Sequence, residues 1–275
     1  MSDLPIWQRL QPVAAIVLVV TLIGIPLWLV VATAGKSQGE AIDPNLSPPT
    51  EWQLLDNLRQ VWVAADVPAA LFGSLLIVVP TVAGVLVLGS MAAWVLARRG
   101  SRLTAILYAL GISGIILPPA VVTVVLLLRQ LGLAGTALGM IGVYLGIYLS
   151  TVIFFVTGFV RTIPSALEEA ARIDGAGPVA VFRRVVLPLL RPVLATATIL
   201  ICLYVWNDVF YAFFVVGGRL DTLPLNLFRV ASAGLYLNNW HLIFAYVILM
   251  SLPLVVVFAV AQRKIISGIT GGAVK

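Results

Sequence analysis

The chain alternates long apolar runs with short polar connections. Six runs approach or exceed about 20 residues, the length that a helix needs to cross the hydrocarbon core of a bilayer. A transmembrane barrel would instead show short segments of alternating hydrophobicity. The pattern therefore predicts an all-α polytopic membrane protein, with a single transmembrane domain over residues 1–275. The six predicted spans cover residues 13–33, 71–97, 104–128, 137–160, 193–216 and 242–262.

Three of these runs contain residues that affect how the run is expected to fold, pack or be processed. Pro118-Pro119 interrupts the third run, and the proline pair is either a packing kink or a break that lines a cavity. Ala32-Thr33-Ala34 resembles a signal-peptide cleavage site, but the first run is longer than a signal core, which favours a retained span. Glycines on one helical face of the fourth run predict close approach of a neighbouring helix rather than solute contact. They are Gly135, Gly139, Gly142 and Gly146.

Composition supports the membrane assignment and excludes several kinds of site. The chain is 61% hydrophobic and only 10% charged, with a mean hydropathy of +1.09. A soluble domain of this size must cover itself with more polar groups. Cys202 is the one cysteine and His241 the one histidine, which excludes an internal disulfide and leaves little scope for a cysteine or histidine metal site.

The basic residues determine the predicted orientation. Six spans place both termini on one side of the membrane, and that side carries twelve of the 17 lysines and arginines. Cytoplasmic loops are enriched in these residues, so both termini are predicted to be cytoplasmic. The net charge of +6 is explained in the same way, without a nucleic-acid partner. The twelve are Arg9, Arg98, Arg99, Arg102, Arg161, Arg172, Arg183, Arg184, Arg191, Arg263, Lys264 and Lys275.

Two connections face outward in this topology. Residues 35–70 contain a predicted amphipathic helix within 50–62, whose apolar residues Trp52, Leu55, Leu58 and Trp62 suit the membrane interface. Residues 217–241 are predicted to form a loop at the membrane surface.

Gly35-Lys36-Ser37 imitates the end of a P-loop, but Val30 occupies the position of the required first glycine, which excludes an ATP site there.

A polar segment on the cytoplasmic side, residues 161–190, separates the fourth and fifth runs. Ser165 and Glu168 have the spacing of a capping box, which predicts a helix from Ala166 to Asp174. Gly175 is placed to end that helix in the left-handed conformation. Pro178 can open a second helix that continues to Leu187 and stops before Pro188.

The same segment contains a spaced motif. Its members are Glu169, Ala170, Ala171, Gly175, Val185, Leu187 and Pro188. The spacing resembles the EAA loop of ABC importer permeases, with Val185 where isoleucine is usual. Because that loop couples such a permease to its ATPase, we call residues 161–190 the coupling segment. Asp174 precedes Gly175 as in the sugar-importing branch of that family.

Further motifs extend the resemblance over nearly the whole chain. Gln262-Arg263, Gly268 and the closing residues Thr270 to Lys275 are similar to the end of the maltose-type permeases of carbohydrate-uptake importers. Trp206-Asn207-Asp208 is similar to a Trp-Asn-Asp/Glu motif of the same family. The resemblance implies the fold of an ABC importer type I permease.

The resemblance implies a transport subunit without enzymatic activity. In this family the EAA helix docks on a cytoplasmic ATPase, which holds the ATP and magnesium, so no cofactor is expected in this chain. The implied partners are a second homologous permease, two copies of the ATPase, an extracytoplasmic solute-binding protein and the lipid bilayer of a bacterial or archaeal cytoplasmic membrane. The implied ATPase-coupling residues are Glu169, Ala170, Ala171, Asp174, Gly175, Leu187 and Pro188, and the implied tail contacts are Gly271, Gly272, Ala273, Val274 and Lys275.

A candidate solute pathway lies in the fifth run. An acidic residue within a span is a functional-site hypothesis by default, and the neighbouring rings and amides suit a polyhydroxylated solute. Alternatively, Asp208 caps a helix break or binds the partner permease. The candidates are Tyr204, Trp206, Asn207, Asp208 and Tyr211.

Three other functions remain open at this point. The same architecture can carry a polyol, glycerophosphodiester, phosphate or peptide in place of a sugar. A secondary transporter can use Asp208 for proton coupling, although this leaves the coupling segment unexplained. A membrane-embedded enzyme is disfavoured, because the spans contain no paired carboxylates, Ser–His pair or metal-ligand cluster.

Overall fold

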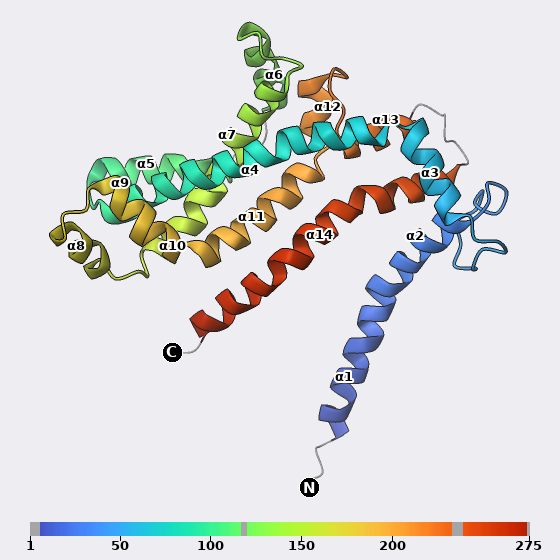
Figure 1. Ribbon diagram of the computed structural model, residues 1–275, viewed down its shortest axis with the longest axis horizontal. Coiled ribbons are helices and arrows are strands. Elements are labelled where there is room, and N and C mark those ends of the chain that lie inside the picture. The colour runs from blue at the N-terminus through green and yellow to red at the C-terminus, as the bar shows by residue number, and fades with distance from the viewer. Residues whose placement is uncertain (1–5, 117–119, 233–238, 274–275) are drawn as a thin grey trace. The chain divides into compact units, whose positions relative to one another are not determined.

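The described part of the chain is helical, and no strand occurs in it. The computed structural model describes residues 6–116, 120–232 and 239–273. Figure 1 shows the course of the chain from α1 to α14. The helices are α1 (Ile6–Val19), the π-helix η1 (Val20–Gly24), α2 (Ile25–Gly35), α3 (Leu54–Ala64), α4 (Val67–Arg98), α5 (Arg102–Ser113), α6 (Val121–Gln130), α7 (Ala137–Val160), α8 (Ala166–Ile173), α9 (Pro178–Val181), the π-helix η2 (Phe182–Val186), α10 (Leu187–Leu189), α11 (Arg191–Trp206), α12 (Phe210–Val216), α13 (Leu223–Ser232) and α14 (Trp240–Ala273).

Several helices are long and apolar enough to cross a membrane. Four qualify singly among the described residues: Gln11–Gly35, Val67–Arg98, Ala137–Val160 and Trp240–Ala259. A fifth candidate is the pair Pro178–Leu189 and Arg191–Trp206, which is bent by 75°. The helices α5 and α6 are apolar but shorter. The count of six spans and their limits therefore stay predictions.

Three predicted elements differ from the observed ones. The run 104–128 forms two helices, α5 and α6, and Pro118-Pro119 lies outside the described residues. The run 193–216 is divided into α11 and α12 by a break at residues 207–209. The connection 217–241, predicted as a loop, contains the helix α13.

The chain forms two compact units, of which the first comprises Met1–Pro68 and Asn226–Pro253. Its outward connection is organised around the end of α2. The buried Asn57 amide of α3 donates to the carbonyl oxygens of Ala34 at 2.8 Å and Lys36 at 2.9 Å. The buried Lys36 ammonium donates to Asn45 Oδ1 at 2.7 Å. Lys36 is therefore a structural residue of this connection, which agrees with its exclusion from a P-loop.

The amphipathic helix α3 buries only a narrow face in this unit. Asn57 and Val61 are its buried residues, whereas Leu55 and Trp62 are exposed. An exposed apolar face of this kind is what the interface helix was predicted to have. Nearby, the Thr50 hydroxyl donates to the Glu40 carboxylate, and this bond lowers the pKa of Glu40.

The second unit comprises Ala69–Leu225 and Leu254–Lys275. Here α4 and α7 approach closely at glycines of α4. A Cβ on Gly89 would lie 2.6 Å from Val152 Cγ1, and a Cβ on Gly84 would lie 2.9 Å from Leu145 Cδ2. Because small residues let helix backbones approach in a membrane, these two glycines bring α4 against α7. This packing places the two longest helices of the unit directly against each other.

The residue Gly73, near the start of α4, lies against the backbone of Asp221. A Cβ there would lie 2.0 Å from the carbonyl oxygen of Asp221, and the next residue, Ser74, accepts a hydrogen bond from the backbone of Leu223 at 2.8 Å. We expect Gly73→Ala to displace this backbone and to lower the free energy of unfolding by about 1–3 kcal/mol. Thermal unfolding in detergent measures the effect.

The matched control is Gly142→Ala, in the second turn of α7, where an added Cβ meets nothing within 4 Å. Alanine is favoured over glycine in a helix by about 1 kcal/mol, so this variant should be as stable as the parent chain or more stable. Equal melting temperatures for the two variants would contradict the close contact at Gly73.

Candidate functional site

The coupling segment consists of two short helical pieces joined at a glycine turn. Gly175 has a φ of +84°, and the backbone N–H of Ala176 donates to the carbonyl of Ala171 at 2.9 Å. Gly175 therefore ends α8 in the left-handed conformation, as predicted. Pro178 is the first residue of α9, which confirms its predicted role, because proline needs no N–H partner there.

The second piece does not end before Pro188. The π-helix η2 and then α10 carry the chain past this residue to Leu189. In a regular α-helix the proline ring clashes with the carbonyl four residues earlier. The wider π turn before Pro188 gives the ring room, so the helical path continues. The chain then turns by 75° into α11.

The predicted coupling residues differ in their exposure to solvent. Glu169, Ala170, Asp174 and Gly175 are exposed, whereas Ala171, Leu187 and Pro188 are half-buried.

Large apolar side chains accompany the exposed residues. Ile173 is 86% exposed, and Leu167 and Val179 are exposed as well. Exposed apolar groups beside charged ones mark a surface that another molecule covers.

The predicted capping box is wrong. Ser165 has helical backbone angles and its hydroxyl makes no cap bond. The Glu168 carboxylate is buried against α4, where it accepts hydrogen bonds from Trp94 Nε1 at 2.9 Å and Arg98 Nε at 2.7 Å. A charged, buried bond to arginine is stronger than a neutral cap bond, so the carboxylate turns away from its own helix end. Figure 1 shows α8, α9 and α10 gathered beside the end of α4.

The residue Asp208 lies in the break between α11 and α12. Its Oδ2 accepts from the Tyr144 hydroxyl at 2.8 Å and from the Ala212 backbone N–H at 3.0 Å, and its Oδ1 accepts from the Tyr211 N–H at 3.4 Å. The carboxylate thus caps the first turn of α12, and its bond to Tyr144 joins residues 207–209 to α7. On the other side of the break, the Asn207 amide donates to the Leu203 carbonyl at 2.9 Å.

Two tyrosines of α7 join this cluster. The ring of Tyr148 lies 5.9 Å from that of Tyr144 and 5.8 Å from that of Tyr204, on which it stacks. Tyr204 is half exposed. We call Tyr144, Tyr148, Tyr204 and Asp208 the tyrosine belt. Tyr144 and Tyr148 were not predicted from the sequence, although two polar rings four residues apart in an apolar span were a usable signal.

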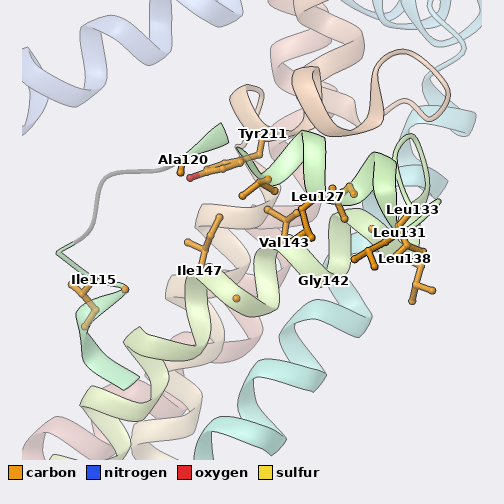
Figure 2. A pocket seen from close by; sticks show the side chains of 15 residues that line it. Ile115, Ala120, Leu127, Leu131, Leu133, Leu138, Gly142, Val143, Ile147 and Tyr211 are labelled. Carbon is orange, nitrogen blue, oxygen red and sulfur yellow. The ribbon is translucent and has the colours of Figure 1, made fainter. Parts of the chain in front are cut away.

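The other two predicted pathway residues are placed differently. Trp206 is buried. Tyr211 lines a cavity of about 650 Å³ between α6 and α7, and Figure 2 shows its ring across the upper edge. The rest of the lining is apolar, including Val143 and Ile147.

The predicted glycine face of α7 borders the same cavity. Gly139, Gly142 and Gly146 line it, and an added Cβ on Gly142 or Gly146 would meet nothing within 4 Å. Gly135, predicted to share this face, instead precedes α7 in a turn with a φ of +76°. No described helix of this chain covers these two glycines. The close helix approach expected here occurs instead at the α4 glycines, which touch another face of α7.

The predicted tail contacts lie only partly within the described residues. The helix α14 runs on through Gly271 and Gly272 to Ala273, whereas Val274 and Lys275 lie outside the described residues.

Within the described ranges, no group of three or more His, Cys, Asp or Glu side chains is placed to hold a metal ion.

Comparison with known proteins identifies the family. Residues 85–270 match the family described as binding-protein-dependent transport system inner membrane component. The chain is 34% identical over 258 residues to the melibiose/raffinose/stachyose import permease protein MelC of Bacillus subtilis, with 91% of each chain covered. It is 30% identical over 267 residues to the diacetylchitobiose uptake system permease protein NgcG of Streptomyces coelicolor, covering 94% of this chain and 86% of that protein.

A solved structure has the same fold. A chain from a bacterial ABC transporter involved in the import of the acidic polysaccharide alginate is similar with a TM-score of 0.79 and 19% identity, covering 96% of this chain and 99% of that one. These findings confirm the resemblance that the motifs indicated. The chain therefore belongs to the family of binding-protein-dependent transport system inner membrane components: it is a multi-pass permease subunit of the cytoplasmic membrane, a transport component and not an enzyme.

Proposed function

We propose that this chain forms half of the translocation pathway of an ATP-driven importer for sugars or sugar-like solutes. It pairs with a second homologous permease in a bacterial or archaeal cytoplasmic membrane. Two copies of an ATP-binding cassette ATPase attach on the cytoplasmic side, and an extracytoplasmic binding protein delivers the solute. The chain crosses the membrane six times with both termini in the cytoplasm, as the distribution of its basic residues indicates.

The exposed face of α8 is the observation that carries the proposal. It presents Glu169, Ala170 and Ile173 away from the rest of the chain. The isoleucine provides apolar area, the alanine lets a partner approach closely, and the carboxylate pairs with a basic or hydrogen-bonding group. A groove on the ATPase with an apolar floor and a basic rim fits this face. The C-terminal residues Gly271 to Lys275 reach the same ATPase pair.

The tyrosine belt supports a sugar as the solute. Aromatic rings stack on the apolar faces of pyranose rings, while hydroxyl and carboxylate groups bond sugar hydroxyls. Tyr204 and Asp208 are the members that we propose to border the pathway, facing the second permease. The two similar relatives are named for melibiose, raffinose and stachyose and for diacetylchitobiose, which are oligosaccharides or sugar derivatives. Trp206, Asn207 and Tyr211 shape the helix break and its surroundings.

A ligand panel and an ATPase assay test the proposal. The co-encoded binding protein is screened against saccharides and polyols, and each ligand is then added to the complete complex in proteoliposomes. We expect at least one saccharide to stimulate ATP hydrolysis in the parent complex. The control carries Glu169→Lys, which places a cation on the docking face and should abolish the stimulation. No response to any saccharide or polyol would overturn the sugar assignment.

A further inference from the structure

The buried Glu168 carboxylate joins the coupling segment to the cytoplasmic end of α4. The residue is 2% exposed, which is rare for a carboxylate and costly unless its oxygens are paired. Arg98 Nε lies 2.7 Å from Oε1 and Trp94 Nε1 lies 2.9 Å from Oε2. Arg172, one turn further along α8, adds its Nη2 at 3.6 Å from Oε2.

Trp94 and Arg98 hold the coupling segment at two further points. Arg98 Nη2 donates to the carbonyl of Ile163 at 2.8 Å, in the turn that leads into α8. The ring of Trp94 lies 5.5 Å from that of Phe182 in η2, and Phe182 is buried. Since Trp94 and Arg98 are four residues apart, both lie on one face of α4. One turn of α4 thus contacts the segment before α8, within α8 and after the glycine turn.

The two adjacent glutamates of α8 face opposite ways. Successive residues of a helix are rotated by about 100°, so Glu168 can face α4 while Glu169 faces outward. The exposed fractions agree, since Glu168 is buried and Glu169 is exposed. The inward carboxylate therefore cannot take part in docking while it holds α4.

The other end of α4 is also tied to the chain. Ser74 accepts a hydrogen bond from the backbone of Leu223 at 2.8 Å, and Gly73 touches the carbonyl of Asp221. A single continuous helix thus connects the coupling segment to residues 221–223, which lie at the opposite end of α4. A displacement of the coupling segment that is passed to Arg98 can therefore reach those residues through α4.

We propose that Glu168, through Arg98 and Trp94, is a positioning residue that delivers the movement of the ATPase from the coupling segment to α4. The inference rests on the proposed function, in which the exposed face of α8 docks on the ATPase. The contact stays closed throughout the transport cycle, so α8 and the end of α4 move together. Docking and transmission are then carried by neighbouring residues with different partners.

The test uses the complete complex and compares Glu168→Gln with Glu169→Lys. Glutamine preserves the size of Glu168 but removes the charge that Arg98 pairs with. We expect the Glu168→Gln complex to retain its ATPase on purification while solute uptake per ATP hydrolysed falls about five- to tenfold, the lower end of the roughly 5–150-fold range of coupling between sites. The Glu169→Lys complex should instead lose ATPase on purification. This difference separates a failure of the transmission contact from a failure of the docking assignment.

Trp94→Phe provides a milder variant that keeps the ring against Phe182 and removes one hydrogen bond from Glu168. It should lower uptake per ATP in the same direction by a smaller factor, and it decides the matter if Glu168→Gln does not assemble. Normal uptake per ATP in an assembled Glu168→Gln complex, or loss of the ATPase from it, would overturn the proposal. Normal uptake per ATP for Trp94→Phe would do so where Glu168→Gln cannot be assembled.

A chemical bridge tests transmission by a gain of function. Cys202 is first replaced by serine, and Arg98→Cys and Glu168→Cys are then combined in that background. The unbridged variant should be uncoupled, and a bifunctional thiol reagent joining the two positions should restore uptake per ATP. A bridge that leaves the unbridged defect unchanged, or that blocks transport until it is cleaved, would show that the contact must open and would refute the proposal.

Discussion

Gly175→Asp is expected to reduce solute uptake about tenfold while the chain remains folded in the membrane. Gly175 has a φ of +84°, and a residue with a Cβ loses about 1–2 kcal/mol in the left-handed region, with aspartate nearer the lower figure. The added side chain would meet nothing within 4 Å, so the cost falls on the backbone of the turn. Relief of that strain moves α8 relative to α9, and ~1.4 kcal/mol of bias is a factor of ten in an equilibrium. Uptake and ATP hydrolysis in proteoliposomes measure the effect.

The same substitution two residues later is the control. Gly177 also has open space around it, but its φ of −69° and ψ of 165° are ordinary for any residue. Gly177→Asp should therefore retain most of the uptake, although it adds the same charge to the same turn. Equal losses in the two variants would assign the effect to charge and contradict the role given to the left-handed turn.

Asp208→Ala is expected to destabilise the second unit and to abolish uptake, whereas Asp208→Asn should preserve much of both. Alanine removes the cap of α12 and leaves the buried Tyr144 hydroxyl without its acceptor. A lost cap costs about 0.5–2 kcal/mol and an unsatisfied buried hydroxyl about 1–3 kcal/mol. The sum predicts a loss of roughly 1.5–5 kcal/mol in the free energy of unfolding. Asparagine keeps one acceptor oxygen for these donors.

This pair of variants separates a structural carboxylate from a proton carrier. Asparagine cannot exchange a proton, so coupling through Asp208 requires both variants to lose uptake equally. Thermal unfolding and ATP-driven uptake, measured on the same preparations, provide the comparison. Tyr144→Phe, which removes one donor and keeps the ring against Tyr148, should resemble the asparagine variant. A stable but inactive Asp208→Asn complex would contradict the structural role.

The local signals of the coupling segment were sufficient to predict its turn. Gly175 and Pro178 act through their own backbone chemistry, which depends little on the rest of the fold. The predicted capping box is wrong because the Glu168 carboxylate can accept hydrogen bonds from any donor within reach, including donors on another helix. Trp94 and Arg98 lie some 70 positions away in the sequence, and nothing local to Glu168 indicates that α4 will bring them to it.

The same distinction applies within the predicted spans. Asp208 was singled out as an acid within an apolar run, but its partner Tyr144 comes from another helix. The glycine face of α7 has the right spacing for close packing, yet spacing does not state which neighbour is present. The contact was found at Gly84 and Gly89 of α4, which carry the same chemistry without a regular pattern.

The central claim is that ATP hydrolysis by the ATPases docked on the coupling segment drives solute through this chain and its partner permease. Its most direct test is the accumulation of the labelled saccharide that the binding protein retains, in proteoliposomes containing the complete complex. Accumulation is expected when ATP is present on the side of the coupling segment, and none is expected from a proton gradient alone. Accumulation driven by the gradient in the absence of ATP would contradict the account.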